Sequence, residues 1–439
     1  MIAVALRNLR HRPGGFVATF LSAFFGATLL MGFGSLLDTA GHLDPAGAES
    51  LTVTASVGGG WCLVIVAFAV TSTLSLAVRQ RAEQIELLRR VGATGPQLRR
   101  MILGEAAGVA LLAAAVAVPA GLLIGRLLLG LLQDTGQVDR TATVVLGPMA
   151  FGAGFGVTLI GSLVAAVAAA RRTTVERGGG SPRPRLRRVG AAVFLLAGTS
   201  CAVVTATVMD GKGIDAMQTA GQAGIWASIG VALLAPELLR LVTALLGAPV
   251  RMLGGAAGEL AVLGARARNR RLAGAVMPVV LFTGIATGTV YMQAVEDEAS
   301  AGQVQPDYAQ DVQTLNYVVV GMITLFVAIM LVNTLIAATV GRRREFAQQR
   351  LAGATRGQLL TMVALEGLLV TVAGVLGGST AALFTVLPFG AARVARWWPD
   401  ASPAAYALIV VVAVALTGAA MLGATRRAIR GPAATMLRA

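Results

Sequence analysis

The chain has 439 residues, of which 56% are hydrophobic and 13% are charged, with a formal net charge of +15. Several apolar stretches exceed the about 18 residues typical of a membrane-spanning helix, which excludes a soluble globular protein and predicts an all-α polytopic membrane protein. The basic residues are scattered between the apolar stretches and not gathered on one module, so the positive charge reports membrane topology and does not indicate nucleic-acid binding.

In chain order, the hydropathy pattern predicts ten transmembrane helices, at 15–37, 60–78, 105–132, 144–170, 189–208, 224–246, 273–294, 316–340, 359–387 and 404–422. The first is as long as a span and lacks a cleavage site, so we expect it to remain as an anchor. The outward loops are short, and the longest, at 38–59 and 295–315, have about twenty residues, too few for a domain with its own core.

The distribution of basic residues, nearly all of them arginine, predicts which loops face the cytoplasm. Thirty of the thirty-six basic residues lie in the amino-terminal segment and in five further segments, 79–100, 171–188, 248–272, 341–358 and 425–439. The positive-inside rule places these segments in the cytoplasm, and because ten is even, both termini are expected there. The preference for arginine over lysine and the high alanine and glycine content indicate a bacterium with a GC-rich genome, so we expect the bacterial plasma membrane.

A segment of the first half recurs 261 residues later. Residues 81–94 read RAEQIELLRRVGAT and residues 344–355 read REFAQQRLAGAT, with the Gly-Ala-Thr triplets in register. The same offset pairs Arg7, Asn8 and Arg10 with Arg268, Asn269 and Arg271. Self-similarity of this length indicates duplication. We predict a first four-span repeat at 1–177, a basic linker with an extra two-span pair at 178–250, and a second four-span repeat, parallel to the first, at 251–439.

The repeated loop predicts a helical elbow on the cytoplasmic face. A helical extension of the preceding span is broken by Gly92 or Gly353, and the Thr-x-x-Gln patterns that follow, from Thr94 and Thr355, fit a capping box that starts the next helix. Such an elbow suits contact with a soluble motor, and its duplication suits a two-fold symmetric one. The alternative is a well-capped loop that binds nothing.

The second copy carries a specific resemblance to a known family. The sequence Asn-Thr-Leu at 333–335, Arg-Arg-Glu-Phe at 343–346 and Arg-Leu-Ala-Gly-Ala-Thr at 350–355 resembles the signature of the FtsX-like permease family. These are the membrane subunits of type VII ABC transporters, a group that includes MacB and LolC/LolE. The plan of four, two and four spans is similar to that of the ten-span bacitracin-resistance permeases. The chain lacks the large outward domain that many of these relatives carry.

The resemblance implies that both elbows are coupling helices that dock on an ATPase subunit. The residues matched to that contact are Arg89, Gly92, Ala93, Thr94, Gln97 and Leu98 in the first copy, and Arg350, Gly353, Ala354, Thr355, Gln358 and Leu359 in the second. No Gly-x-x-x-x-Gly-Lys-Ser/Thr motif is present, so the chain is expected to be non-catalytic, with no cofactor or metal of its own. ATP and Mg²⁺ belong to a partner of the MacB/LolD type, with two copies per permease chain.

A few polar residues fall within or near the predicted spans. Glu105 and Glu366 lie near the starts of the third and ninth spans, where a nearby arginine can fix each of them. Arg240 either pairs with Glu237, three residues earlier, or extends toward the interface, and Arg126 either extends in the same way or contacts anionic lipid. Asn333, in the eighth span, belongs to the family signature. We expect structural roles for these side chains.

Three function classes remain open. The first is an ATP-driven permease that exports a hydrophobic or amphiphilic peptide, drug or lipid, or extracts it from the outer leaflet. The second is a mechanotransmitting regulatory module acting on an extracytoplasmic or membrane partner, for which the acidic run at 296–298 is the only hint. The third, an ATP-independent secondary transporter, is disfavoured because helix-breaking pairs do not recur at matched mid-membrane positions.

Overall fold

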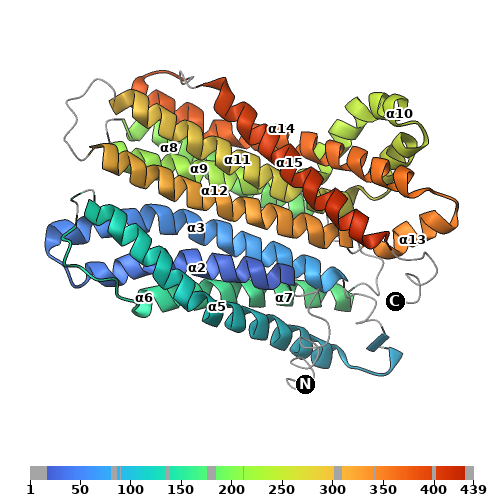
Figure 1. Ribbon diagram of the computed structural model, residues 1–439, viewed down its shortest axis with the longest axis horizontal. Coiled ribbons are helices and arrows are strands. Elements are labelled where there is room, and N and C mark those ends of the chain that lie inside the picture. The colour runs from blue at the N-terminus through green and yellow to red at the C-terminus, as the bar shows by residue number, and fades with distance from the viewer. Residues whose placement is uncertain are drawn as a thin grey trace. The chain divides into compact units, whose positions relative to one another are not determined.

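The computed structural model describes residues 17–80, 87–88, 90–134, 136, 138–175, 184–210, 212–300, 309–340, 342–397 and 402–430. Over these residues the protein is helical and contains no strands (Figure 1). Ten of the described helices are long and apolar enough to cross a membrane. The prediction of an all-α polytopic membrane protein is therefore confirmed.

The helices form two compact units. Unit 1 comprises Met1–Arg183 and Gln303–Phe326, and unit 2 comprises Pro184–Gly302 and Val327–Ala439. The long helix α12, Ala309–Val340, is shared between them. This grouping by contact differs from the predicted division at residues 177 and 250, which rests on sequence register and remains a prediction.

Unit 1 is built around its first helix. It contains α2 (Val17–Ala40), α3 (Pro45–Gln80), α5 (Gly95–Asp134), α6 (Pro148–Phe151), the π-helix η2 (Gly152–Val157) and α7 (Thr158–Val175). The central helix α2 packs against both α3 and α5, and α7 packs against these same two helices. The fourth predicted span is thus interrupted by a π-helical stretch between α6 and α7.

Unit 2 is built around a central pair of helices. It contains α8 (Pro184–Val208), α9 (Gly213–Leu233), α10 (Ala235–Ala267), α11 (Asn269–Ser300), α13 (Arg343–Leu351), α14 (Arg356–Val394) and α15 (Pro403–Ala428). The central pair is α11 with α14, and α9, α10 and α15 pack against it. In turn, α8 packs against α9 and α14.

Three predicted boundaries are wrong. The outward loop expected at 295–315 is shorter, because α11 continues to Ser300 and α12 begins at Ala309. The loop expected at 38–59 is mostly helix, because α3 begins at Pro45 and packs along α2: Leu51 is fully buried, and a β-carbon at Gly58 would lie 2.4 Å from the ring of Phe33. The helix expected at 224–246 is divided, since the backbone leaves helical geometry at Leu234 and α10 begins at Ala235. Its first turn carries Pro236, which has no amide proton to continue the bonding of α9.

Candidate functional site

The second elbow, from Ala352 to Gln358, has the predicted geometry. Helix α13 ends at Leu351, and Gly353 follows with φ of +98°. This is the left-handed region, where a β-carbon is costly and glycine is favoured. The amide of Ala354 donates to the carbonyl of Gln349 at 3.0 Å, which closes the turn. The tight reversal between α13 and α14 therefore depends on a glycine at this position.

A capping box starts α14 at the second elbow. The hydroxyl of Thr355 accepts a hydrogen bond from the amide of Gln358 at 3.2 Å, and the side-chain oxygen of Gln358 accepts one from the amide of Thr355 at 2.9 Å. Two amides that have no partner within the helix are thereby satisfied. The capping box predicted from the sequence is confirmed here.

The first elbow, from Val91 to Gln97, has the same backbone design. Gly92 has φ of +102°, and the amide of Ala93 donates to the carbonyl of Leu88 at 2.9 Å. The side chain of Gln97 accepts from the amide of Thr94 at 3.0 Å, as its counterpart does in the second copy. The predicted contact residue Arg89 lies outside the described residues.

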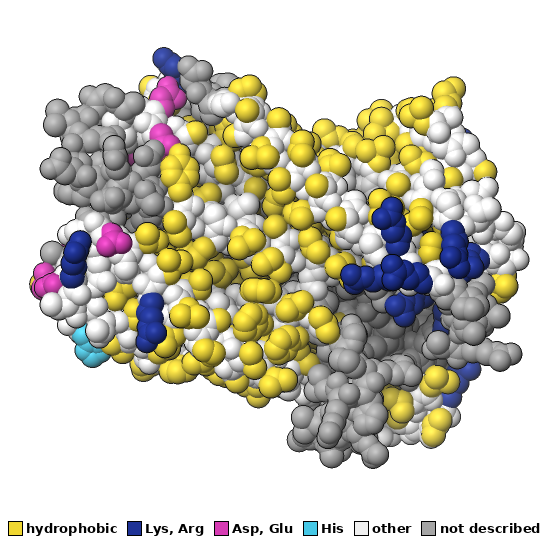
Figure 2. Space-filling model, in the orientation of Figure 1, with side chains coloured by type: hydrophobic (Ala, Val, Ile, Leu, Met, Phe, Trp, Pro, Cys, Tyr) yellow, Lys and Arg dark blue, Asp and Glu magenta, His cyan; other side chains and the backbone are white. Residues whose placement is uncertain are grey.

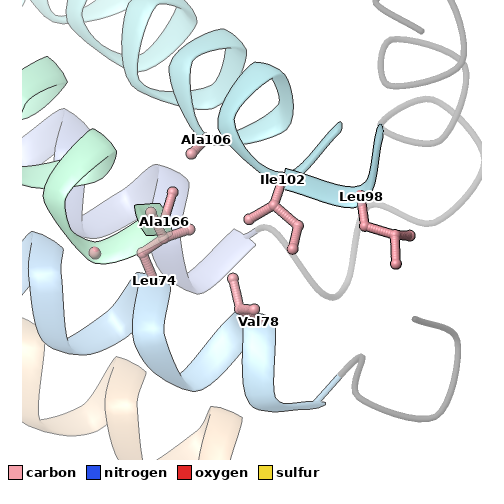
Figure 3. Packing of buried hydrophobic residues seen from close by; sticks show 7 residues of the cluster. Leu74, Val78, Leu98, Ile102, Ala106 and Ala166 are labelled. Carbon is pink, nitrogen blue, oxygen red and sulfur yellow. The ribbon is translucent and has the colours of Figure 1, made fainter. Parts of the chain in front are cut away.

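The matched elbow residues divide into an exposed group and a buried pair. Gly92, Thr94 and Gln97 are exposed, as are Gly353, Thr355 and Gln358, while Ala93 and Ala354 are half-buried. Leu98 and Leu359 are buried and face the protein interior. In unit 1, Leu98 lies at the edge of a buried cluster that also contains Ile102 of α5 and Leu74 and Val78 of α3 (Figure 3). The leucines therefore hold the elbows in place, and the exposed residues before them form the surface that a partner can reach.

The exposed surface of the first elbow is partly apolar. Val91 is 88% exposed, and Leu87 and Leu88 just before it are also exposed. In the second elbow Ala352 corresponds to Val91 and is exposed, as is Leu351 beside it, where the first elbow has Arg90; the arginines Arg343 and Arg344 are nearby in sequence. Exposed apolar side chains at a polar turn are typical of a surface that another protein covers.

A buried cluster of charges fastens the second elbow to the spans. The carboxylate of Glu366 on α14 is fully buried and accepts two hydrogen bonds from the Arg342 guanidinium, at 2.5 and 3.1 Å. The same guanidinium donates to Glu345 of α13 at 2.9 Å. Arg268, which lies between α10 and α11, pairs with Glu345 and lies 3.7 Å from the Glu366 carboxylate. Four charges thus connect α13, α14 and the start of α11.

Two further contacts hold α13. Arg342 lies 5.1 Å from the centre of the ring of Phe346, which is itself fully buried. The guanidinium of Arg350 donates to the carbonyl of Ile429, just after α15, at 3.1 Å. Arg350 is therefore turned toward its own chain, and the elbow of unit 2 is joined to α11, α14 and α15.

The expectation that a nearby arginine fixes Glu366 is confirmed, but the sequence analysis did not identify Arg342 and Arg268, although a signal for them was present. By the offset of 261, Arg268 corresponds to Arg7, Arg342 to Arg81, Glu345 to Gln84 and Glu366 to Glu105. Glu105 is buried, and the other three first-copy residues lie outside the described part of the chain. The signal is that two arginines and the glutamate recur at matched positions in the two copies, which points to one charge cluster in each copy.

The other polar residues named from the sequence are paired, exposed or buried on single helices. Glu237 pairs with Arg187 at 2.5 Å and Arg188 at 3.6 Å, both from α8. The suggested pairing with Arg240 is wrong, because Arg240 points to the exposed face of α10. Arg126 is exposed on α5, and Asn333 is buried on α12. Among the described residues, no three His, Cys, Asp or Glu side chains lie close enough to hold a metal ion.

The ends of the spans opposite the elbows are held by other contacts. In unit 1, the Asp38 carboxylate at the end of α2 accepts hydrogen bonds from the amides of Gly147, Met149 and Ala150, at 2.8 to 3.0 Å, where α6 begins. In unit 2, Arg393 of α14 makes a two-bond ion pair with Glu296 of α11, at 2.5 and 2.8 Å. These contacts were not predicted, because an acidic residue at the end of a span does not reveal its partner.

Comparison with known sequences finds the same family twice along the chain. The family described as FtsX-like permease C-terminal matches residues 56–174 and residues 317–433, which together make up more than half of the chain. The two matched segments begin 261 residues apart, the same offset that relates the elbows. Each segment contains one elbow and the buried glutamate that follows it. A search of curated proteins finds no match.

Proposed function

Because the chain belongs to the FtsX-like permease family and is thus the permease component of an ABC transporter, we propose that its two elbows dock the ATPase subunits and carry their motion to the spans. FtsX-like permeases work with ATP-binding subunits, and the elbows present exposed glycine, threonine and apolar side chains on rigid, capped turns. One permease chain carries two elbows, which favours two ATPase subunits of the MacB/LolD type.

The observation that carries this proposal is the charge cluster around Glu366. Separating the buried Glu366 carboxylate from its arginines would leave an uncompensated charge, which costs about 3–5 kcal/mol. A push on α13 is therefore expected to move α14 and the start of α11 with it and not to deform the elbow. When two ATPases close on ATP, such movement shifts the opposite ends of the spans.

For the transported compound, we propose a small hydrophobic or amphiphilic peptide, drug or lipid. Among the described residues, the connections opposite the elbows are short, with four residues at 41–44 and ten at 138–147, and neither is long enough for a large extramembrane receptor. A compound that partitions into the bilayer reaches the spans from the side and needs no such receptor. On this proposal the protein lies in a bacterial plasma membrane with the elbows and both termini in the cytoplasm.

The docking role is tested with substitutions at exposed elbow positions. Val91→Asp combined with Ala352→Asp places a charge on each surface without touching a buried side chain. In lipid nanodiscs, we expect the variant to lose co-purification with a MacB/LolD-type ATPase and to lose permease-dependent ATP hydrolysis, with thermal unfolding unchanged. Arg140→Asp, an exposed change between α5 and α6 at the opposite end of unit 1, is the matched control and should behave as wild type.

The outcomes separate the function classes. Wild-type binding and hydrolysis in the double variant would overturn the docking role and reopen the secondary-transporter class. Coupled hydrolysis that none of a panel of amphiphilic peptides, drugs and lipids stimulates would contradict the export role and favour the regulatory module.

A further inference from the structure

Helix α10 is a hairpin and not a single span. Its length and composition fit a membrane crossing, but the backbone at Gly255 has φ of +52° and ψ of −132°, which divides it into arms at 235–254 and 256–267. A β-carbon at Gly258 would lie 2.3 Å from the carbonyl oxygen of Val250, and one at Gly247 would lie 3.5 Å from Val262. The arms are therefore antiparallel and closely packed.

The second arm of the hairpin crosses α14 instead of running along it, whereas the first arm follows α14 from Gly377, which Leu238 meets, to Leu365. A β-carbon at Gly254 would lie 2.4 Å from Leu365, and one at Gly264 would lie 2.9 Å from the carboxylate of Glu366. Residues ten apart on the hairpin thus meet adjacent residues of α14, so the second arm lies at a steep angle to the α14 axis. If α14 crosses the membrane, this arm lies close to the membrane plane.

The side of the hairpin that faces away from unit 2 carries an apolar stripe on each arm. The exposed apolar residues recur with the helical period, as Leu241, Leu245, Ala248 and Met252 on the first arm and Ala256, Leu260, Leu263 and Ala267 on the second. Met252 and Leu253, beside the bend, are 87% and 86% exposed. Figure 2 shows hydrophobic side chains gathered over α10, which lies at the upper right of Figure 1.

Charged residues lie beside this stripe. Arg240 and Arg251 lie three turns apart on the first arm, Arg266 is on the second, and all three are exposed. Arg251 lies 3.8 Å from Glu259 across the two arms. Each arm thus has a face buried against unit 2, an apolar exposed stripe and a charged exposed stripe, which is the pattern of a helix lying at a lipid–water interface.

The position of the hairpin along α14 also fits a lipid–water interface. Leu365 lies nine residues after the start of α14 at Arg356, which is about 14 Å along a helix at 1.5 Å per residue. From Leu368 onward α14 exposes its own leucines, including Leu376 and Leu383. The apolar stripe of α10 therefore lies beside the part of α14 where leucines begin to face outward.

The geometry points to α10 as an interfacial hairpin whose leucine and methionine stripe inserts into the lipid leaflet on the elbow side, with Arg240, Arg251 and Arg266 against anionic headgroups. The sixth crossing is then α9, whose 21 residues span about 31 Å. Helix α9 is not among the ten helices apolar enough by composition to face lipid, but it is largely buried against α8, α11 and α14, so the number of crossings stays at ten. The hairpin ends at Arg268, a member of the charge cluster, so it anchors the base of α11 to the membrane surface beside the second elbow.

Spin labels on the full chain test this assignment. In a background where Cys62→Ala and Cys201→Ala remove the native thiols, single nitroxides are attached at Met252→Cys, Leu260→Cys and Glu259→Cys, and the protein is placed in nanodiscs of phosphatidylcholine and phosphatidylglycerol. Oxygen concentrates in lipid, whereas a nickel chelate stays in water. We expect labels at 252 and 260 to collide more with oxygen, and the label at the neighbouring polar position 259 to collide more with nickel.

Three results would overturn the proposal. Greater nickel accessibility at 252 and 260 would place the stripe in water. Shielding from both reagents only after the ATPase is added would make it a motor contact. Shielding from both without the ATPase, together with disulfide cross-linking of Met252→Cys between chains, would make it an interface between two copies. The expected result and the first and third of these outcomes are measured without the ATPase, so this test and the docking test fail separately.

Discussion

Gly92 in the first elbow and Gly353 in the second have φ of +102° and +98°, and in both turns a glutamine accepts from the amide of the threonine three residues before it. Their surroundings differ. The first exposes Val91, where the second has Ala352, and the second carries Glu345, where the first has Gln84. A turn made by neighbouring residues has thus been kept while the surface and the charges around it have changed, so the two elbows need not be equivalent to a motor.

The largest expected effect is at Glu366. Glu366→Gln removes the buried charge that both Arg342 and Arg268 approach, and we expect a loss of about 3–5 kcal/mol in the free energy of unfolding, with permease-dependent ATP hydrolysis falling more than ATPase binding. The midpoint of thermal unfolding and the two ATPase assays measure this. Glu296→Gln, which breaks the ion pair at the opposite end of unit 2, is the control and should leave coupling intact. Equal effects of the two changes on coupling would contradict a special role for the elbow cluster.

Replacing Gly92 or Gly353 with alanine tests whether the two elbows have the same backbone conformation. Neither Gly92 nor Gly353 has an atom within 4 Å of where a β-carbon would lie, so alanine strains only the left-handed backbone, by about 1–2 kcal/mol. We expect equal losses of thermal stability at both positions. Gly357→Ala, in the first turn of α14, should be neutral or slightly stabilising. A clear difference between the two glycines would show that the elbows are not held alike.

The smallest expected effect makes the second elbow resemble the first. Glu345→Gln leaves Arg342 and Arg268 with Glu366 as a partner, so we expect a loss of only about 1 kcal/mol, as for a partly exposed ion pair. Measured as a double-mutant cycle with Arg268→Gln, the coupling energy should be positive but modest. A loss as large as that of Glu366→Gln would mean that Glu345 stabilises the cluster as much as Glu366 does. The first elbow, which has Gln84 at the matched position, would then be the less stable of the two.

Prediction from sequence succeeded where the relevant partners are close along the chain. The turn at Gly353, the capping box from Thr355 to Gln358 and the long apolar helices all follow from residues within about one helical turn of one another. It failed where partners are distant. Glu237 pairs with Arg187 of α8 and not with Arg240, although the latter is only three residues away. The choice depends on how α8 packs near α10, which no local pattern contains.

By itself, the sequence determined that this is a duplicated membrane protein with a glycine-centred, capped elbow in each copy, because hydropathy, self-similarity and turn chemistry are properties of contiguous residues. Only the tertiary structure decided that α3 extends back to Pro45, that the chain bends at Leu234 and again at Gly255, and that Arg268 and Arg342 converge on Glu366. The physical reason is the same in each case. Burial against another helix, or the need to neutralise a buried charge, outweighs local preference, and both depend on residues far away in the chain.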